Sequence, residues 1–207
     1  IAPFPVKGPK EYTDLIFDKI EDIVSHHADH LALARNPQEL EVNRRAGKHT
    51  IMLGIENGQA FDHSLDNIDH FAARGIVYTT LCHNGDNDIC DSARGTHTWG
   101  GLSPFGRDVV ARMNSLGVMV DLSHAAESSF YDALEASRTP IVCSHSSCRA
   151  LCDHPRNLTD DQMRRLAEKG GVMQVTAYNG FLSTKGDAAI YTLMDHLRHA
   201  ADVMGID

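Results

Sequence analysis

Short, nearly uninterrupted apolar segments recur along the chain, and longer segments with helical spacing separate them. These apolar segments lack the strict alternation of a strand that is exposed on one side, so they predict a parallel sheet whose two faces are both covered. We expect five strands, over residues 50–56, 75–83, 117–124, 140–145 and 171–178.

The intervening segments carry the start and stop signals of helices. Ser103 stands at the N-cap position of one expected helix, and Gly117 follows its last turn. Thr159 and Gln162 have the spacing of a capping box ahead of a second helix. The two other helices are expected over residues 64–73 and 126–137. This alternation of strand and helix is typical of repeated βα units.

Four reactive side chains fall at the carboxyl ends of four successive expected strands: Glu56, His83, His124 and His145. In a (β/α)8 barrel these ends converge on one mouth, where the active site lies. An open doubly wound sheet would bind ligands mainly at one crossover, and its glycine-rich phosphate loop is absent after the first strand. The sequence therefore predicts an α/β fold of the (β/α)8 TIM-barrel type.

The chain is short for such a barrel, which typically needs about 250 residues. It has 207 residues and five strand candidates. We expect residues 1–207 to form a single catalytic barrel domain that is represented by an incomplete set of strands, without the first strand and the C-terminal strands. The sequence starts without a methionine, so we also expect the gene to start upstream.

Composition excludes several classes of partner. A formal net charge of −9 without a basic stripe argues against nucleic acid. No run of eighteen apolar residues is present, so we expect no membrane segment in this chain. The five cysteines lack finger-like or CxxC spacing, which favours free or buried thiols.

The residue types at the strand ends point to a metal centre. Neutral imidazole and carboxylate are the ligands that Zn²⁺ takes in catalytic sites, and ligands from separate strands leave a coordination position for water. A serine hydrolase is disfavoured because no G-x-S-x-G motif occurs and because Ser144 and His145 should point to opposite faces of a strand. HExxH is also absent.

A chelating pattern near the start is a weaker candidate. His27 and Asp29 are two positions apart, as in a His-x-Asp pair on a strand. The surrounding apolar spacing is helical, and positions i and i+2 of a helix diverge by about 200°. We therefore expect these side chains to lie on a solvated helix face.

Five short motifs occur in order at or near the expected strand ends: GIENG (54–58), TLCHN (80–84), DLSH (121–124), SHSS (144–147) and HPRN (154–157). From about residue 50 to its end, the chain resembles the membrane dipeptidase family, also called renal dipeptidase, including its bacterial members. The DLSH, SHSS and HPRN series is specific to that family.

The resemblance implies a barrel with two zinc ions at its mouth and hydrolysis of dipeptides by a metal-activated hydroxide. Glu56 matches the carboxylate that bridges the two metals. His124 and His145 match the histidines that complete the second metal's protein ligands. His83 matches a residue that stabilises the developing oxyanion, and Arg156 matches the residue that binds the substrate's free C-terminal carboxylate.

Other aspects of the family pattern stay open. Tyr178 lies where an aromatic pocket wall would stand, although core packing is an equal alternative. The family's first-strand His-x-Asp and its later DFDG segment are not found in strand context here. A non-catalytic barrel with one metal site therefore remains an alternative, as does another TIM-barrel metallohydrolase of the deaminase or lactonase type. Family members are often homodimers.

Overall fold

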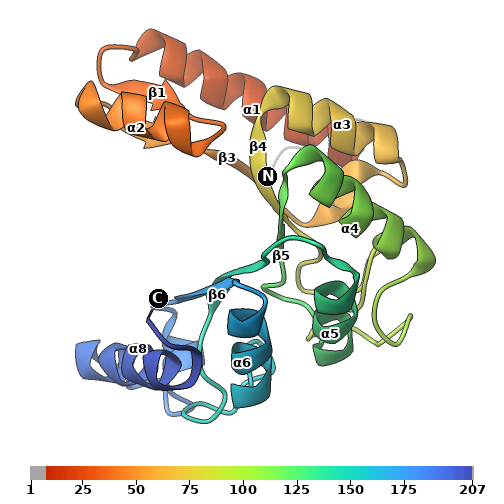
Figure 1. Cartoon of the computed structure of the whole chain (residues 1–207), viewed down its shortest axis with the longest axis vertical. Coiled ribbons are helices and arrows are strands. Elements are labelled where there is room, and N and C mark those ends of the chain that lie inside the picture. Colours follow the sequence, from red (N-terminus) through yellow and green to blue (C-terminus); the bar gives the residue numbers. More distant parts are fainter. Residues whose placement is uncertain (1–7, 207) are drawn as a thin grey trace.

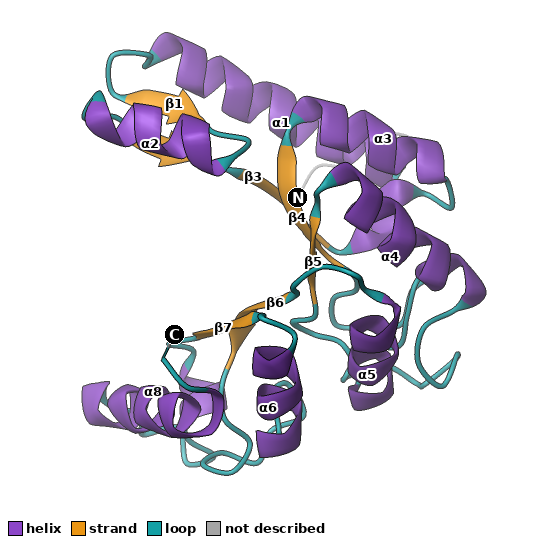
Figure 2. Cartoon of the chain, viewed as in Figure 1, coloured by secondary structure: helices purple, strands orange, loops and turns teal. Residues whose placement is uncertain are grey.

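The centre of the molecule is a five-stranded parallel sheet with the spatial order β3-β4-β5-β6-β7, which is also the order in the sequence. We describe residues 8–206 of a computed structural model. The strands are β3 (Leu53–Glu56), β4 (Ile76–Thr80), β5 (Met119–Asp121), β6 (Val142–Ser146) and β7 (Val172–Val175). Figure 2 shows them fanning out as a curved wall.

Helices follow the strands and cover the convex side of this wall (Figures 1 and 2). They are α3 (Leu65–Arg74), α4 (Pro104–Leu116), α5 (Glu127–Ala136) and α6 (Asp160–Glu168). After β7 come the short α7 (Asn179–Leu182) and α8 (Ile190–Met204). Consecutive parallel strands joined by outer helices form the wall of a (β/α) barrel, so the fold class predicted from the sequence is confirmed.

Residues 8–51 add a separate layer. Helix α1 (Pro9–His26) is followed by β1 (Leu31–Leu33), α2 (Pro37–Arg45) and β2 (His49–Ile51), and the two short strands pair in parallel. A 3-10 turn, η1 (Gly58–Phe61), follows β3. The β1–β2 pair and α8 lie at opposite tips of the arc in Figure 1.

Two expectations for this region are wrong. The strand predicted over residues 50–56 is divided at Met52, which is 49% exposed, because β2 pairs with β1 rather than continuing into β3. The helix expected through His27 and Asp29 ends at His26, and both residues lie in an exposed turn before β1. They are solvated, as predicted, but not as part of a helix face.

The predicted helix boundaries in the barrel are confirmed. Ser103 accepts a hydrogen bond from the backbone N–H of Gly106 at 2.8 Å, and Gly117 ends α4 at a φ of 72°. Thr159 and Gln162 form the reciprocal capping box of α6. Each cap satisfies backbone donors that the first helical turn leaves unpaired.

A core of apolar side chains fills the space between the sheet and its outer helices. Phe71, Val110 and Met113 from the helices are fully buried there, as is Val120 from β5. All five cysteines are free and buried, which confirms the prediction from their spacing. Within residues 8–206, no helix has the length and apolar character needed to cross a membrane.

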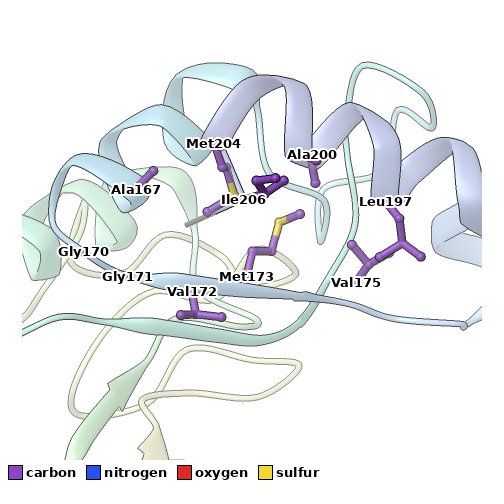
Figure 3. A pocket seen from close by; sticks show the side chains of 12 residues that line it. Ala167, Gly170, Gly171, Val172, Met173, Val175, Leu197, Ala200, Met204 and Ile206 are labelled. Atoms are coloured by element: carbon purple, nitrogen blue, oxygen red, sulfur yellow. The ribbon is translucent and has the colours of Figure 1, made fainter.

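An apolar groove of about 470 Å³ lies between β7 and α8 (Figure 3). Met173 of β7 points toward Met204 and Ile206 in this groove. None of the lining residues has a titratable side chain. The groove therefore lacks groups for acid–base or metal chemistry, and the reactive side chains must be sought at the strand ends.

Candidate metal centre and substrate pocket

The four side chains predicted at strand ends gather in one place, although two of them lie beyond their strands. Glu56 is the last residue of β3, and His145 lies within β6. His83 and His124 each follow the strand end by three residues, because β4 ends at Thr80 and β5 ends at Asp121 rather than at the histidine. Loops after β4 and β5 therefore place these two imidazoles.

Glu56, His124 and His145 could share a metal ion. The Nε2 atoms of His124 and His145 each lie 3.2 Å from Glu56 Oε1. One ligand atom from each of the three residues lies within 4.8 Å of the others. His83 Nε2 is farther from the same oxygen, at 3.9 Å, and its ring centroid lies 4.3 Å from that of His124. His83 thus lies beside the triad, but farther from Glu56 than His124 and His145 do.

The turn after β5 determines where His124 points. Asp121 Oδ1 accepts a hydrogen bond from the backbone N–H of Ser123 at 3.0 Å, and Ala125 N–H donates to Leu122 O at 3.1 Å. Within this turn His124 has a φ of 74°, in the left-handed region. Few residues other than glycine adopt this conformation, and they are concentrated at functional sites.

Both histidines of the triad are uncharged near neutral pH. Burial, reinforced by the nearby positive charge of Arg156, lowers the pKa of His124 to about 3. The same two causes lower the pKa of His145. The close contacts with Glu56 are therefore not ion pairs. Two neutral imidazole nitrogens and one carboxylate oxygen that converge on a point form a donor set that fits a zinc-type cation.

A network behind His145 fixes the orientation of its ring. Ser144 Oγ lies 2.6 Å from Asp121 Oδ2 and 2.8 Å from His145 Nδ1. A carboxylate only accepts, so the single hydroxyl hydrogen of Ser144 goes to Asp121, and Oγ accepts from His145 Nδ1–H. The Nε2 lone pair of His145 then faces Glu56.

This contact corrects the geometric argument from the sequence. Ser144 and His145 were expected on opposite faces of a strand, yet their side chains are hydrogen-bonded. The register of β6 against β7 shifts between Cys143 and Ser146, and such an irregularity changes where side chains point. Ser144 orients a histidine here.

Arg156 lies beside the triad in the loop after β6. Its side chain is 4% exposed, and one guanidinium nitrogen, Nη2, donates to the backbone oxygen of His145 at 3.3 Å. Its buried Nε has no hydrogen-bond partner among residues 8–206. The guanidinium carbon lies 5.0 Å from the centre of the Phe181 ring. A buried arginine with an unused donor is poised to bind an anion.

Arg156, His124 and His145 line one pocket of about 340 Å³. Tyr178 also lines it and lies at the N-cap of α7, where it is 63% exposed. It is therefore not a core residue among the described residues 8–206. Its ring contacts Phe181 with centroids 4.8 Å apart.

Sequence reasoning missed Arg94 and Phe181, which line the same pocket. Neither residue belongs to the five quoted motifs, and neither follows an expected strand directly. Arg94 lies in the long loop between β4 and α4, and Phe181 lies in the four-residue helix α7. Only the folded loops bring them to the strand ends.

A curved parallel sheet with a carboxylate and imidazoles at or near its strand ends is typical of barrels that bind a metal ion. The family model described as membrane dipeptidase (peptidase family M19) matches residues 12–207. The chain therefore belongs to the membrane dipeptidase family, as the motifs indicated.

Relatives agree with this assignment. An uncharacterized dipeptidase from Schizosaccharomyces pombe is 42% identical over 156 residues, which are 74% of this chain and 38% of the relative. The crystal structure of an amidohydrolase from Pseudomonas aeruginosa superposes with a TM-score of 0.90 at 28% identity, covering 96% of this chain and 60% of that one. A probable dipeptidase, also from Pseudomonas aeruginosa, gives a TM-score of 0.88 at 25% identity, covering 91% and 63%.

The chain spans only part of its relatives. Coverage of four curated relatives runs from 38% to 50% of their length.

Proposed function

We propose that this chain belongs to a zinc-dependent enzyme that hydrolyses dipeptides. One observation supports this above all others: His124 and His145, two members of the metal-ligand triad, line the same pocket as the buried Arg156. The pocket thus combines a candidate metal centre with a group that binds a carboxylate. A dipeptide offers a scissile carbonyl one residue away from a free carboxylate.

Glu56, His124 and His145 would hold the metal. The family pattern implies two zinc ions per complete active site, with Glu56 bridging them. When bound, zinc polarises a carbonyl and lowers the pKa of water to near neutrality. The chain's own contribution is to keep two imidazoles neutral and aimed at one point.

Arg156 would orient the substrate by its C-terminal carboxylate. Its planar guanidinium suits a bidentate carboxylate contact, and burial strengthens such a contact because little water competes for it. A longer peptide would place an amide bond where this carboxylate belongs. Binding of the C-terminal carboxylate by Arg156 therefore favours dipeptides over longer peptides.

His83 would stabilise the negative charge that develops on the carbonyl oxygen. It lies 3.9 Å from Glu56 Oε1 and is about half exposed, so it adjoins the triad without being enclosed by it. A donor aimed at that oxygen contributes mainly in the transition state. Tyr178 would form part of the pocket wall around the C-terminal residue.

Hydrolysis of L,L- and L,D-dipeptides by the full-length gene product tests this function. We expect cleavage that chelation removes and added zinc restores, and that is lost when the substrate's C-terminus is amidated. His145→Ala and Arg156→Ala should both impair it, while Arg138→Ala, at an exposed arginine away from the pocket, should not. Zinc binding without cleavage of any dipeptide would refute the proposal.

A further inference from the structure

The charged side chains that line the pocket beside the triad are arginines, in a chain that is acidic overall. The formal net charge of the chain is −9, yet the pocket lining contains two arginines, Arg94 and Arg156, and no aspartate or glutamate. Asn84 and Thr176 add neutral polar groups to the same lining. Such a surface attracts an anionic ligand and repels a cationic one.

A ligand with a single carboxylate would balance the charge of only one of the two arginines. Arg156 is the buried member of the pair and suits the main-chain carboxylate of a dipeptide. The exposed guanidinium of Arg94 has no hydrogen bond or ion pair within residues 8–206. It remains available for a second anionic group on the same ligand.

The backbone holds Arg94 at the pocket. Its own N–H donates to Ser92 Oγ at 3.2 Å, and the neighbouring Ala93 N–H donates to His124 O at 2.8 Å. Asp86 accepts hydrogen bonds from the backbone N–H groups of Ser92 and Thr96 on either side, at 2.8 and 3.0 Å. Arg94 therefore extends from a fixed turn that is attached to the metal-ligand turn.

Both arginines act on one further pocket residue. Burial lowers the pKa of His154, and the positive charges of Arg156 and Arg94, together with Arg149, lower it further. Arg149 does not line this pocket, and its side chain pairs with Glu127 at 3.1 Å. Arg94, His154 and Arg156 line one pocket of about 340 Å³, so a single small ligand could contact both arginines.

We propose that Arg94 is a specificity residue that binds a carboxylate side chain on the substrate's C-terminal residue. The preferred substrates are then dipeptides that end in aspartate or glutamate, with Arg156 on the main-chain carboxylate and Arg94 on the side chain. This inference rests on the proposed dipeptidase function and adds the substrate class.

The test compares dipeptides that differ only in that charge. Ala-Asp, Ala-Asn and Ala-Ala, with the C-terminal residue in either configuration, are assayed with the full-length, zinc-loaded protein. Calorimetric titration of the metal-free protein with the same dipeptides measures binding without turnover. The variants are Arg94→Gln, which removes the charge, Arg94→Lys, which keeps it, and Arg138→Gln as a matched exposed arginine outside the pocket.

We expect kcat/KM for Ala-Asp to exceed that for Ala-Asn roughly tenfold, the factor of one partly exposed charge-assisted hydrogen bond. Arg94→Gln should bring this ratio close to one, whereas Arg94→Lys and Arg138→Gln should keep most of it. Binding to the metal-free protein should follow the same order.

Two contrary outcomes differ in meaning. If dipeptides are cleaved but aspartate has no advantage over asparagine, or Arg94→Gln keeps the advantage, the role of Arg94 is wrong and the dipeptidase function stands. If no dipeptide is cleaved or bound, the proposed function fails and the specificity fails with it.

Discussion

Asp121 accepts the hydroxyl hydrogen of Ser144 across 2.6 Å. Thr80 Oγ1 donates to the same carboxylate at 2.6 Å, and the backbone N–H of Ser144 donates to its other oxygen at 3.0 Å. The buried carboxylate is thereby fixed, and through Ser144 it decides which ring nitrogen of His145 carries hydrogen. A residue that touches no substrate thus controls a candidate metal ligand.

Removing the Ser144 hydroxyl should therefore weaken metal binding. We expect Ser144→Ala to lower zinc affinity about 10- to 100-fold, the usual cost of losing a partner behind a ligating histidine. Competition with a chelator of known affinity measures this. Ser115→Ala, at an exposed serine on α4, is the control. Equal zinc affinity in Ser144→Ala and the wild type would show that the network does not orient His145.

His83 and His145 should separate catalysis from metal binding. We expect His83→Asn to keep its zinc and to lose about 10²- to 10³-fold in kcat, since a donor to the oxyanion acts in the transition state. His145→Ala should lose zinc as well as activity. The test is the zinc content of both purified variants, measured together with their kcat. If His83→Asn contains no zinc, His83 is a metal ligand rather than a donor to the oxyanion.

The Phe181 ring should support substrate binding through Arg156. The guanidinium lies over this half-buried ring, and a cation–π contact contributes about 0.5–2 kcal/mol, depending on its exposure. We expect Phe181→Leu to raise KM several-fold with a smaller effect on kcat, and Phe181→Tyr to restore most of the loss. Tyr191→Leu, at an exposed ring on α8, controls for the loss of an aromatic side chain. If KM is unchanged in Phe181→Leu, the Phe181 ring does not support substrate binding by Arg156.

Asp86 should make stability depend on pH in the acidic range. Burial alone would raise its pKa, but hydrogen bonds from Ser92, Thr96 and Thr98 together lower it well below the usual range. A lowered folded-state pKa means that the contribution is complete above the unfolded value of about 3.9 and is lost as pH falls further. The free energy of unfolding should decline below about pH 4.

Asp86→Asn tests this dependence. At pH 7 the variant should be less stable by about 1–3 kcal/mol, because a carboxylate is replaced by a weaker acceptor. Its stability should then fall less than that of the wild type between pH 4 and pH 2. Urea unfolding at several pH values measures both, with Asp202→Asn on the exposed face of α8 as the control. If the free energy of unfolding falls equally with pH in the wild type and in Asp86→Asn, the Asp86 carboxylate is not the cause of the pH dependence.

Local signals were sufficient to predict the barrel sheet and its outer helices. The caps at Ser103 and Thr159 lie within a few residues of the groups they satisfy, so they can be recognised in sequence. The grouping of Glu56 with His124 and His145 followed from barrel topology, which brings parallel strand ends together.

Other features depended on contacts that no local pattern contains. The split at Met52 arises because β2 pairs with β1, some twenty residues upstream. The end of α1 at His26 is set by the turn into β1. Ser144 meets His145 because the register of β6 shifts, and a strict two-residue alternation cannot anticipate that. Arg94 reaches the pocket through a loop fixed by Asp86.

At His124 the left-handed backbone conformation favours glycine, whereas metal binding requires a histidine. Glycine would adopt a φ of 74° without the steric cost that any Cβ brings, so the residue suited to this turn is not the residue suited to a metal site. His124→Gly should be more stable than His124→Ala by about 1 kcal/mol in thermal unfolding. A redesign guided by stability alone would favour glycine here and would erase the candidate metal site.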